Sequence, residues 1–289
     1  MFTRTPIVAA VAVLSTALLS TASASTAGAA AAHSAQAASA AHVPTVVVHM
    51  SDSAIHLSVG HRLHAGRVLF RVKTRHGGHD LQLARLHSGY TLSEAERDFG
   101  KAFNKGDIAA IRRLDHNITF LGGASTRPGQ PGAFSVNLHA ARLLVFDQDS
   151  NAMTRLRVFG TPQPRPIVAA SSQVTTFTYG FGVSRPTIPR SGWTRVRNSS
   201  DQPHFVVFQH VKNRTTHRTV AKFIRSGAHG NPSWALKANA SVGVLSPNRA
   251  EVFRYHLPAG KYLMACFWPD DDTGMPHFFM GMWRLIRLR

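Results

Sequence analysis

The chain has one cysteine, Cys266, among its 289 residues. No intramolecular disulfide can form, so the fold must be held together by apolar packing. The lone thiol is therefore buried and inert, intermolecular, or a metal ligand. Beyond the N-terminal leader no apolar run approaches the ~18 residues of a membrane-spanning helix, so we expect no membrane span.

Signatures of common hydrolases are also lacking. The sequence contains no Gly-x-Ser-x-Gly and no His-Glu-x-x-His, and its 14 carboxylates are too few to suggest an obvious acid–base pair. These absences favour an electron carrier or a binding protein over an enzyme.

Acidic residues are outnumbered by 33 lysines and arginines, which gives a formal net charge of +19. A charge this high favours contact with polyanions. The basic residues are scattered singly, without a basic run interleaved with aromatics, so no specific nucleic-acid site is expected. A solvated basic surface is the first interpretation, and an anionic cell-wall polymer is the candidate partner.

The N-terminus predicts export. Arg4 precedes the apolar segment "IVAAVAVLSTALL", and small-residue sites follow it, as in a secretory signal peptide over residues 1–30. Residues 31–43 are alanine-rich and predict a flexible lead-in. We therefore expect a secreted, extracellular protein.

The rest of the chain is dominated by strand patterns such as "RVLFRVK" and "HFVVFQHV". Helices are predicted over "TLSEAERDFGKAFN", where Thr91 and Glu94 form a capping box, over "GDIAAIRRLD" and over "HRTVAKFIRS". The proline-rich segment 161–172 predicts a linker between domains at 44–160 and 173–289.

The two predicted domains read as copies of one unit. Aligning their strands places His79 opposite His204 and Asp147 opposite Cys266. Each copy has several short strands and a helical excursion. The fold prediction is therefore all-β, with two tandem Greek-key β-sandwiches that each carry a short helical insertion.

The segment "YLMACFWPDDDTGMPHFFMGM" near the C-terminus concentrates metal-binding side chains. A mononuclear blue-copper site uses two His nitrogens, a Cys thiolate and a weak axial Met. His204 begins a predicted strand, Cys266 ends a later one, and His277 and Met282 lie in the loop before the last strand. The ligand types thus occur in the order that such a site requires.

In these segments the sequence resembles the cupredoxins, the plastocyanin and amicyanin group in particular. The resemblance covers about 120 residues of the second half through "PHFVVF" and "AGKYLMACFWPDDDTGMPHFFMGMWRLIRL". It implies one copper ion held by His204, Cys266, His277 and axial Met282, with Met280 as the alternative. It also implies electron transfer with a redox partner protein, or copper handling, with Trp268, Phe267 and Phe278 excluding water.

One feature departs from the family: ten residues separate Cys266 from His277, where members usually have two to four. The first copy lacks the thiolate, since Asp147 stands in its place, and is expected to bind no metal. Asp270, Asp271 and Asp272 are interpreted as a solvated turn. The histidines of "HRLH" and "HGGH" are interpreted as exposed loop residues.

Two other function classes stay open. A multicopper oxidase or copper nitrite reductase would also have paired cupredoxin domains, but trinuclear oxidase centres use His-x-His pairs, and none occurs. A metal-free extracellular module that uses its basic faces on an anionic partner is the main alternative.

Overall fold

The computed structural model describes residues 43–228 and 230–289. The predicted signal peptide and residues 31–42 of the predicted lead-in lie outside the described residues. The first half contains β1 (Thr45–Ser51), β2 (Ala54–Leu57), β3 (Arg62–Thr74), β4 (His79–Leu86), α1 (Leu92–Lys105), α2 (Ile108–Asn117), β5 (Ile118–Thr126), β6 (Gly132–Leu138), β7 (Ala141–Asp147) and β8 (Met153–Gln163).

The second half contains β9 (Ser172–Phe177), β10 (Gly180–Val183), β11 (Thr187–Ile188), β12 (Ser191–Asn198), β13 (His204–Val211), α3 (His217–Arg225), β14 (Ala235–Leu245), β15 (Ala250–His256), β16 (Gly260–Ala265) and β17 (Trp283–Leu288). The three helices confirm those that the sequence predicts. Thr91 and Glu94 form the predicted capping box at the start of α1.

The strand pairing of the first half is repeated in the second. β1 runs parallel to β3, and β9 runs parallel to β12. The antiparallel pairs β3–β6, β4–β5, β4–β7 and β7–β8 correspond to β12–β15, β13–β14, β13–β16 and β16–β17. The predicted pair of β-sandwiches with helical excursions is therefore confirmed.

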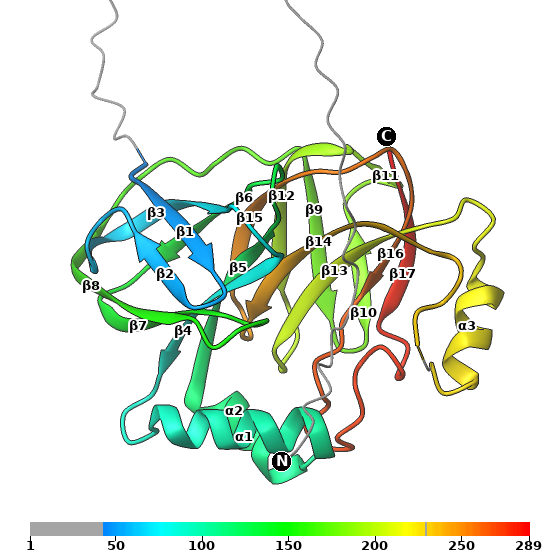
Figure 1. Cartoon of the computed structure of the whole chain (residues 1–289), viewed down its shortest axis with the longest axis horizontal. Helices are drawn as coiled ribbons and strands as arrows, with labels where there is room; N and C mark the ends of the chain where they lie inside the picture. The colour runs from blue at the N-terminus through cyan, green and yellow to red at the C-terminus, as the bar shows by residue number, and fades with distance from the viewer. Residues whose placement is uncertain (1–42, 229) are drawn as a thin grey trace, which may run out of the picture.

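The two sandwiches are fused through both of their sheets (Figure 1). β6 pairs antiparallel with β15, and β5 pairs antiparallel with β14. Each pairing joins a sheet of the first half to a sheet of the second. Most buried apolar side chains form one large cluster that includes residues from Val46 to Leu288, and a smaller cluster includes Val220 of α3. The halves thus share sheets and core.

Small residues and one buried amide allow β5 and β14 to approach each other closely. A Cβ added to Gly243 of β14 would lie 2.4 Å from the backbone nitrogen of Gly123 in β5, so only glycine fits. The buried Gln82 side chain accepts a hydrogen bond from Val244 N at 2.7 Å and donates one to Val244 O at 3.1 Å. The amide thus satisfies backbone groups of the other half in place of a strand partner.

The predicted linker 161–172 overlaps the end of β8, which runs to Gln163, and the first residue of β9. Only residues 164–171 lie outside both strands. None of the helices in the described part of the chain is long and apolar enough to cross a membrane.

Helices α1 and α2 form a hairpin at one end of the molecule, and the connection from β16 to β17 comes down beside it (Figure 1). Arg113 of α2 donates two hydrogen bonds of 2.8 Å to the buried Asp98 of α1, and Tyr90 donates a third. The bonds from Arg113 lower the pKa of Asp98 to about 2, so the carboxylate stays charged and ties the helices together.

Candidate metal centre

Neighbouring strands bring His204 and Cys266 together. His204 is the first residue of β13, and Cys266 directly follows β16. These strands pair antiparallel, with Val207 opposite Ala265. This register places the start of β13 beside the end of β16. His277 reaches the same place from the connection to β17.

The three side chains converge in a buried cluster. Cys266 Sγ lies 3.6 Å from His204 Nδ1 and 3.8 Å from His277 Nδ1, and the two Nδ1 atoms are 3.1 Å apart. His204 is 1% exposed, and the other two residues are fully buried. Among the described residues this is the only group of three or more His, Cys, Asp or Glu side chains close enough to hold one ion.

The separations fit a shared metal. Ligand atoms about 2.0–2.3 Å from one ion stand roughly 3–4 Å from one another, which is the range found here. Two imidazoles and a thiolate are the planar donor set of a blue-copper site. The buried Nε2 of His204 has no hydrogen-bond partner, so no polar group competes to turn this ring away from the cluster.

Burial sets the protonation of the cluster. It lowers the pKa of His204 to about 3, with a contribution from His277, and the pKa of His277 to about 4. Both imidazoles are therefore neutral near pH 7 and can offer lone pairs. Burial raises the pKa of Cys266 to about 12, so a metal must displace the thiol proton when it binds.

The long Cys-to-His connection folds as a small hairpin. Pro269 and Pro276 form an isolated antiparallel bridge, and His277 N donates to Trp268 O at 2.9 Å. Residues 269–276 therefore project as a closed turn, which we call the ligand-loop hairpin. It brings His277 next to Trp268, two residues after Cys266. The ten intervening residues therefore bring His277 as close to Cys266 as a short connection would.

A hydrogen-bonded chain fixes the outer edge of His277. Gln202 Oε1 lies 2.8 Å from His277 Nε2, while Gln202 Nε2 donates to Asp270 Oδ2 at 3.0 Å. Tyr179 OH donates to the same carboxylate oxygen at 2.6 Å. Burial alone would raise the pKa of Asp270, but the hydrogen bonds from Tyr179, Thr273 and Gln202 hold it well below its usual range.

This chain determines the tautomer of His277. A charged Asp270 only accepts hydrogen bonds, so the amide of Gln202 must turn its nitrogen toward the carboxylate and its oxygen toward His277. His277 then carries its proton on Nε2, and its Nδ1 lone pair faces His204 and Cys266. The sequence interpretation of Asp270 as part of a solvated turn is wrong, because this residue is fully buried.

The two methionine candidates differ in placement. Met282 is fully buried, its N donates to His277 O at 2.9 Å, and its O accepts from Cys266 N at 3.3 Å. Met280 is partly exposed, and its sulfur accepts a hydrogen bond from Thr273 in the ligand-loop hairpin. Met280 N also donates to His277 O, at 3.0 Å, so the full burial of Met282 and its backbone bond with Cys266 are what favour Met282 as the axial candidate.

The corresponding place in the first half holds a hydrogen-bonded His–Asp pair. His79 Nδ1 lies 2.8 Å from Asp147 Oδ2, and Asp147 also accepts hydrogen bonds from Asp80 N, Asp149 N and Ser150 Oγ. The carboxylate oxygens are thus already occupied by protein donors. His79 is 2% exposed, so its interpretation as an exposed loop residue is wrong, whereas His61 and His76 of the same motifs are exposed.

Sequence reasoning missed Gln202, Asp270 and Tyr179 as parts of the site. Gln202 stands two residues before His204, and this proximity was the only available signal for it. Tyr179 adopts φ +58°, an uncommon backbone conformation for a bulky residue, in the turn between β9 and β10. Its ring meets that of His277 edge-on, with centroids 5.5 Å apart.

No family model and no curated protein sequence matches the chain. Among solved structures it is similar to a reduced auracyanin from Roseiflexus castenholzii, at 18% identity over 42% of this chain and 99% of that one, with a TM-score of 0.25. It is also similar to auracyanin A, a blue copper protein from Chloroflexus aurantiacus, at 18% identity over 40% and 99% of the two chains, with a TM-score of 0.23.

A third similar structure is the copper-containing nitrite reductase of Thermus scotoductus, at 9% identity over 85% of this chain and 61% of that one, with a TM-score of 0.23. Scores this low carry no argument, so only the chain's own strand pairing and side-chain cluster support an assignment. The chain folds as two fused β-sandwiches of one repeated strand plan, with a buried His-Cys-His cluster at one end of the second.

Proposed function

We propose that the second half binds one copper ion through His204, Cys266 and His277, with Met282 as the axial ligand, and that the protein transfers single electrons. The observation that carries this proposal is the convergence of one sulfur and two nitrogen donors in a buried cluster. Bound copper would supply a one-electron couple whose potential depends on the axial ligand and the surrounding hydrogen bonds.

The residues around the cluster suit this task. Gln202 orients the His277 ring, and β13 and β16 hold His204 and Cys266 at fixed separations. A donor set held rigidly by its surroundings changes little between oxidation states, which favours fast electron transfer. All three ligand side chains are buried. Release of the ion to a partner would require ligand exchange, so burial favours electron transfer over copper delivery.

The test is copper titration of the purified mature protein. We expect uptake of one Cu(II) per chain and an intense visible thiolate-to-copper band. Cys266→Ser should fold and lose the band. A colourless protein that binds no copper would refute the proposal, and more than one ion per chain would favour a multicopper enzyme. A redox partner protein would be sought with the coloured form.

We propose further that the chain is exported, because residues 1–30 have the pattern of a signal peptide. The N-terminal sequence of protein recovered from the culture medium tests this. A start shortly after Ala24 or Ala29 supports export, and full-length protein retained in cells contradicts it.

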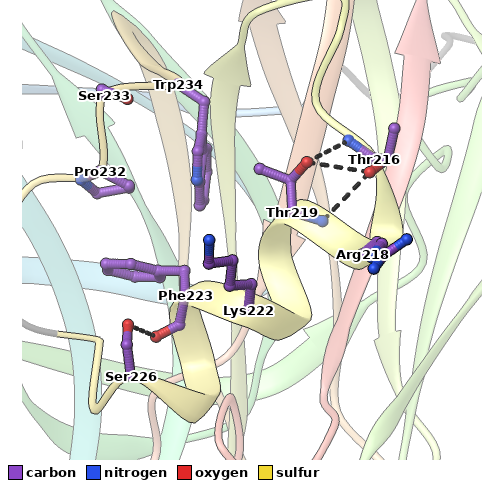
Figure 2. A pocket seen from close by; sticks show the side chains of 9 residues that line it. All are labelled: Thr216, Arg218, Thr219, Lys222, Phe223, Ser226, Pro232, Ser233 and Trp234. Atoms are coloured by element: carbon purple, nitrogen blue, oxygen red, sulfur yellow. Dashed lines mark hydrogen bonds between the residues drawn. The ribbon is translucent and has the colours of Figure 1, made fainter.

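A second candidate function is binding of an anionic polymer at α3 (Figure 2). Residues 202–250 contain seven lysines and arginines but no aspartate or glutamate. On α3, Arg218 and Lys222 line an open pocket of about 460 Å³. No carboxylate of the described residues lies within ion-pair distance of either cation, so both are available to an anionic ligand.

The rest of this pocket suits a polymer that has hydroxyl groups. Thr216, Thr219, Ser226 and Ser233 contribute hydroxyls, and Trp234 packs edge-on against Phe223 with ring centroids 5.6 Å apart. The partner chemistry that fits is a phosphodiester polymer of a wall surface, with phosphates on the cations and its carbon backbone on the indole.

Binding of a poly(glycerol phosphate) chain to immobilised protein tests this site. The double variant Arg218→Gln, Lys222→Gln should lose at least about tenfold in affinity, or about 1.4 kcal/mol. The control Arg185→Gln, Arg287→Gln removes the same charge from two exposed positions elsewhere. Equal losses in the two variants would show that only net charge matters and would refute the site.

A further inference from the structure

We propose that the α1–α2 hairpin of the first half positions the copper ligand His277, so that the metal centre of the second half depends on the metal-free half. The proposal rests on the proposed copper site for its functional meaning. Its physical content is that contacts with the first half hold the ligand-loop hairpin, residues 269–276, in place.

The main contact is the side chain of Trp268. The residue is 1% exposed, and its ring meets three phenylalanines of the first half edge-on. The centroid distances are 6.4 Å to Phe99, 5.4 Å to Phe103 and 5.2 Å to Phe120. The indole Nε1 donates to Asp115 Oδ1 of α2 at 3.2 Å. The only tryptophan in the Cys-to-His connection is thus enclosed by the other half.

The tip of the ligand-loop hairpin makes a second contact. Gly274 and Gly106, the C-cap of α1, meet backbone to backbone. A Cβ on Gly106 would lie 2.9 Å from Gly274 O, and a Cβ on Gly274 would lie 2.2 Å from Gly106 O. Both glycines have positive φ, at +60° and +71°. The first half therefore contacts the ligand-loop hairpin at its tip, through Gly274, and also encloses Trp268, the residue just before it.

A third contact lies at the solvent edge. Arg112 of α2 donates to Asp271 O and to Asp272 Oδ1, each at 2.8 Å. The side chains of Arg112 and Asp272 are largely exposed, so this ion pair adds orientation more than stability.

Trp268 transmits its position directly to the ligand. Its carbonyl accepts the backbone hydrogen bond of His277, and it lies two residues from Cys266. If the indole left the aromatic cluster, the base of the ligand-loop hairpin would move, and His277 would lose the backbone bond that holds it near the thiol. The first half thereby has a role that needs no metal of its own.

Cys266 provides a readout that needs no copper. It is the only cysteine in the chain and is fully buried, so a thiol reagent reaches it only when the structure opens. We expect Trp268→Ala, without metal, to label at least roughly tenfold faster than wild type below its unfolding transition. Trp268→Phe, which restores an aromatic ring, should return most of the protection.

A matched pair of glycine variants separates positioning from general destabilisation. Gly106→Ala and Gly89→Ala both place a side chain at positive φ in the first half, but Gly89 has nothing within 4 Å of its added Cβ. Only Gly106→Ala should accelerate labelling of Cys266, which lies in the other half. Val72→Ala, in the core of β3, serves as a variant of reduced global stability.

Four results would be decisive. The labelling rates are compared at urea concentrations where the variants have equal global stability. Faster labelling of Trp268→Ala and Gly106→Ala than of Gly89→Ala and Val72→Ala supports the proposal. Equal labelling in all four overturns it. If wild type binds no copper but the labelling pattern holds, then the copper function fails while the positioning role stands. If wild type shows the visible copper band and Trp268→Ala keeps both this band and the protection of Cys266 from labelling, then the positioning role fails while the copper function stands.

Discussion

His79 and His204 occupy equivalent positions in the two sandwiches, yet they face different partners. His79 begins β4, which pairs with β7, and β7 ends at Asp147. His204 begins β13, which pairs with β16, and Cys266 directly follows β16. His79 Nδ1 lies 2.8 Å from a carboxylate oxygen, and His204 Nδ1 lies 3.6 Å from a sulfur. One place in a repeated fold thus holds a hydrogen-bonded His–Asp pair in one copy and the His-Cys-His cluster in the other.

This difference predicts where copper binds. His204→Ala should abolish the visible band and stoichiometric uptake, because it removes one of three strong donors. His79→Ala should keep one copper per chain, since its partner carboxylate already accepts three other hydrogen bonds. The second variant removes one hydrogen-bond partner of the buried Asp147, so we expect a loss of about 1–3 kcal/mol in unfolding free energy. Elemental analysis and urea denaturation measure both effects.

Removing the amide that orients His277 should weaken the metal site while leaving all ligands in place. In Gln202→Leu the Nε2 proton of His277 loses its acceptor, so the ring can exchange tautomers or turn. We expect copper affinity to fall about 10- to 100-fold. Nitrogen-15 NMR of the metal-free protein should show mixed tautomers for His277, where wild type shows the proton on Nε2.

Gln209→Leu is the control, because its amide lies on β13, seven residues after Gln202, and bonds instead to the carbonyls of His210 and Leu236. An unchanged His277 spectrum in Gln202→Leu would contradict the assigned role of Gln202.

The sequence predicted the repeated fold because it depends on local patterns. Alternating apolar residues and the Thr91–Glu94 capping box can be recognised within short segments of the sequence. The two matching halves can be recognised by comparing such segments. The same holds for the ligand order, because His204 and Cys266 mark strand ends. The fusion of the sandwiches through β5–β14 and β6–β15 was not predictable, since strand edges of both halves look alike before they pair.

The ligand-loop hairpin shows a second limit of sequence reasoning. Ten residues between Cys266 and His277 count against a metal site when only spacing is considered. The fold removes the objection through the Pro269–Pro276 bridge and the enclosure of Trp268 by the other half. The enclosure depends on contacts between residues more than 140 positions apart, such as Trp268 with Phe120. The buried role of Asp270 was missed because its partners Tyr179 and Gln202 are also distant in the sequence.

The two methionines should affect the redox potential differently. Met282→Leu would remove the proposed axial donor, so the potential of bound copper should rise while the thiolate band persists. Met280→Leu should leave the potential unchanged, because the sulfur of Met280 bonds to Thr273 near the surface. Protein-film voltammetry of the two variants compares them. A rise only in Met280→Leu would reverse the axial assignment.

Asp115 should make the protein less stable as pH rises. Its Oδ2 is buried without a partner, and burial, with a contribution from Asp271, raises its pKa to about 8. The unfolded carboxyl ionises near pH ~3.9. Between these values the native state holds a proton that the unfolded state has lost, so the free energy of unfolding falls with rising pH, by at most about 1.4 kcal/mol per unit. The decline should level off above about pH 8, where both states are ionised.

Asp115→Asn should remove this part of the decline, because the amide stays neutral and can still accept the hydrogen bond from Trp268 Nε1. The stability of the variant relative to wild type should therefore increase steadily between pH 5 and pH 8. Glu251, whose pKa burial raises well above its ordinary value, leaves a residual slope in both proteins. Asp52→Asn, an exposed carboxyl, controls for the change in net charge. Urea unfolding across pH 5–9 measures the difference, and parallel curves for wild type and Asp115→Asn would show that Asp115 ionises in the native state as it does in the unfolded chain.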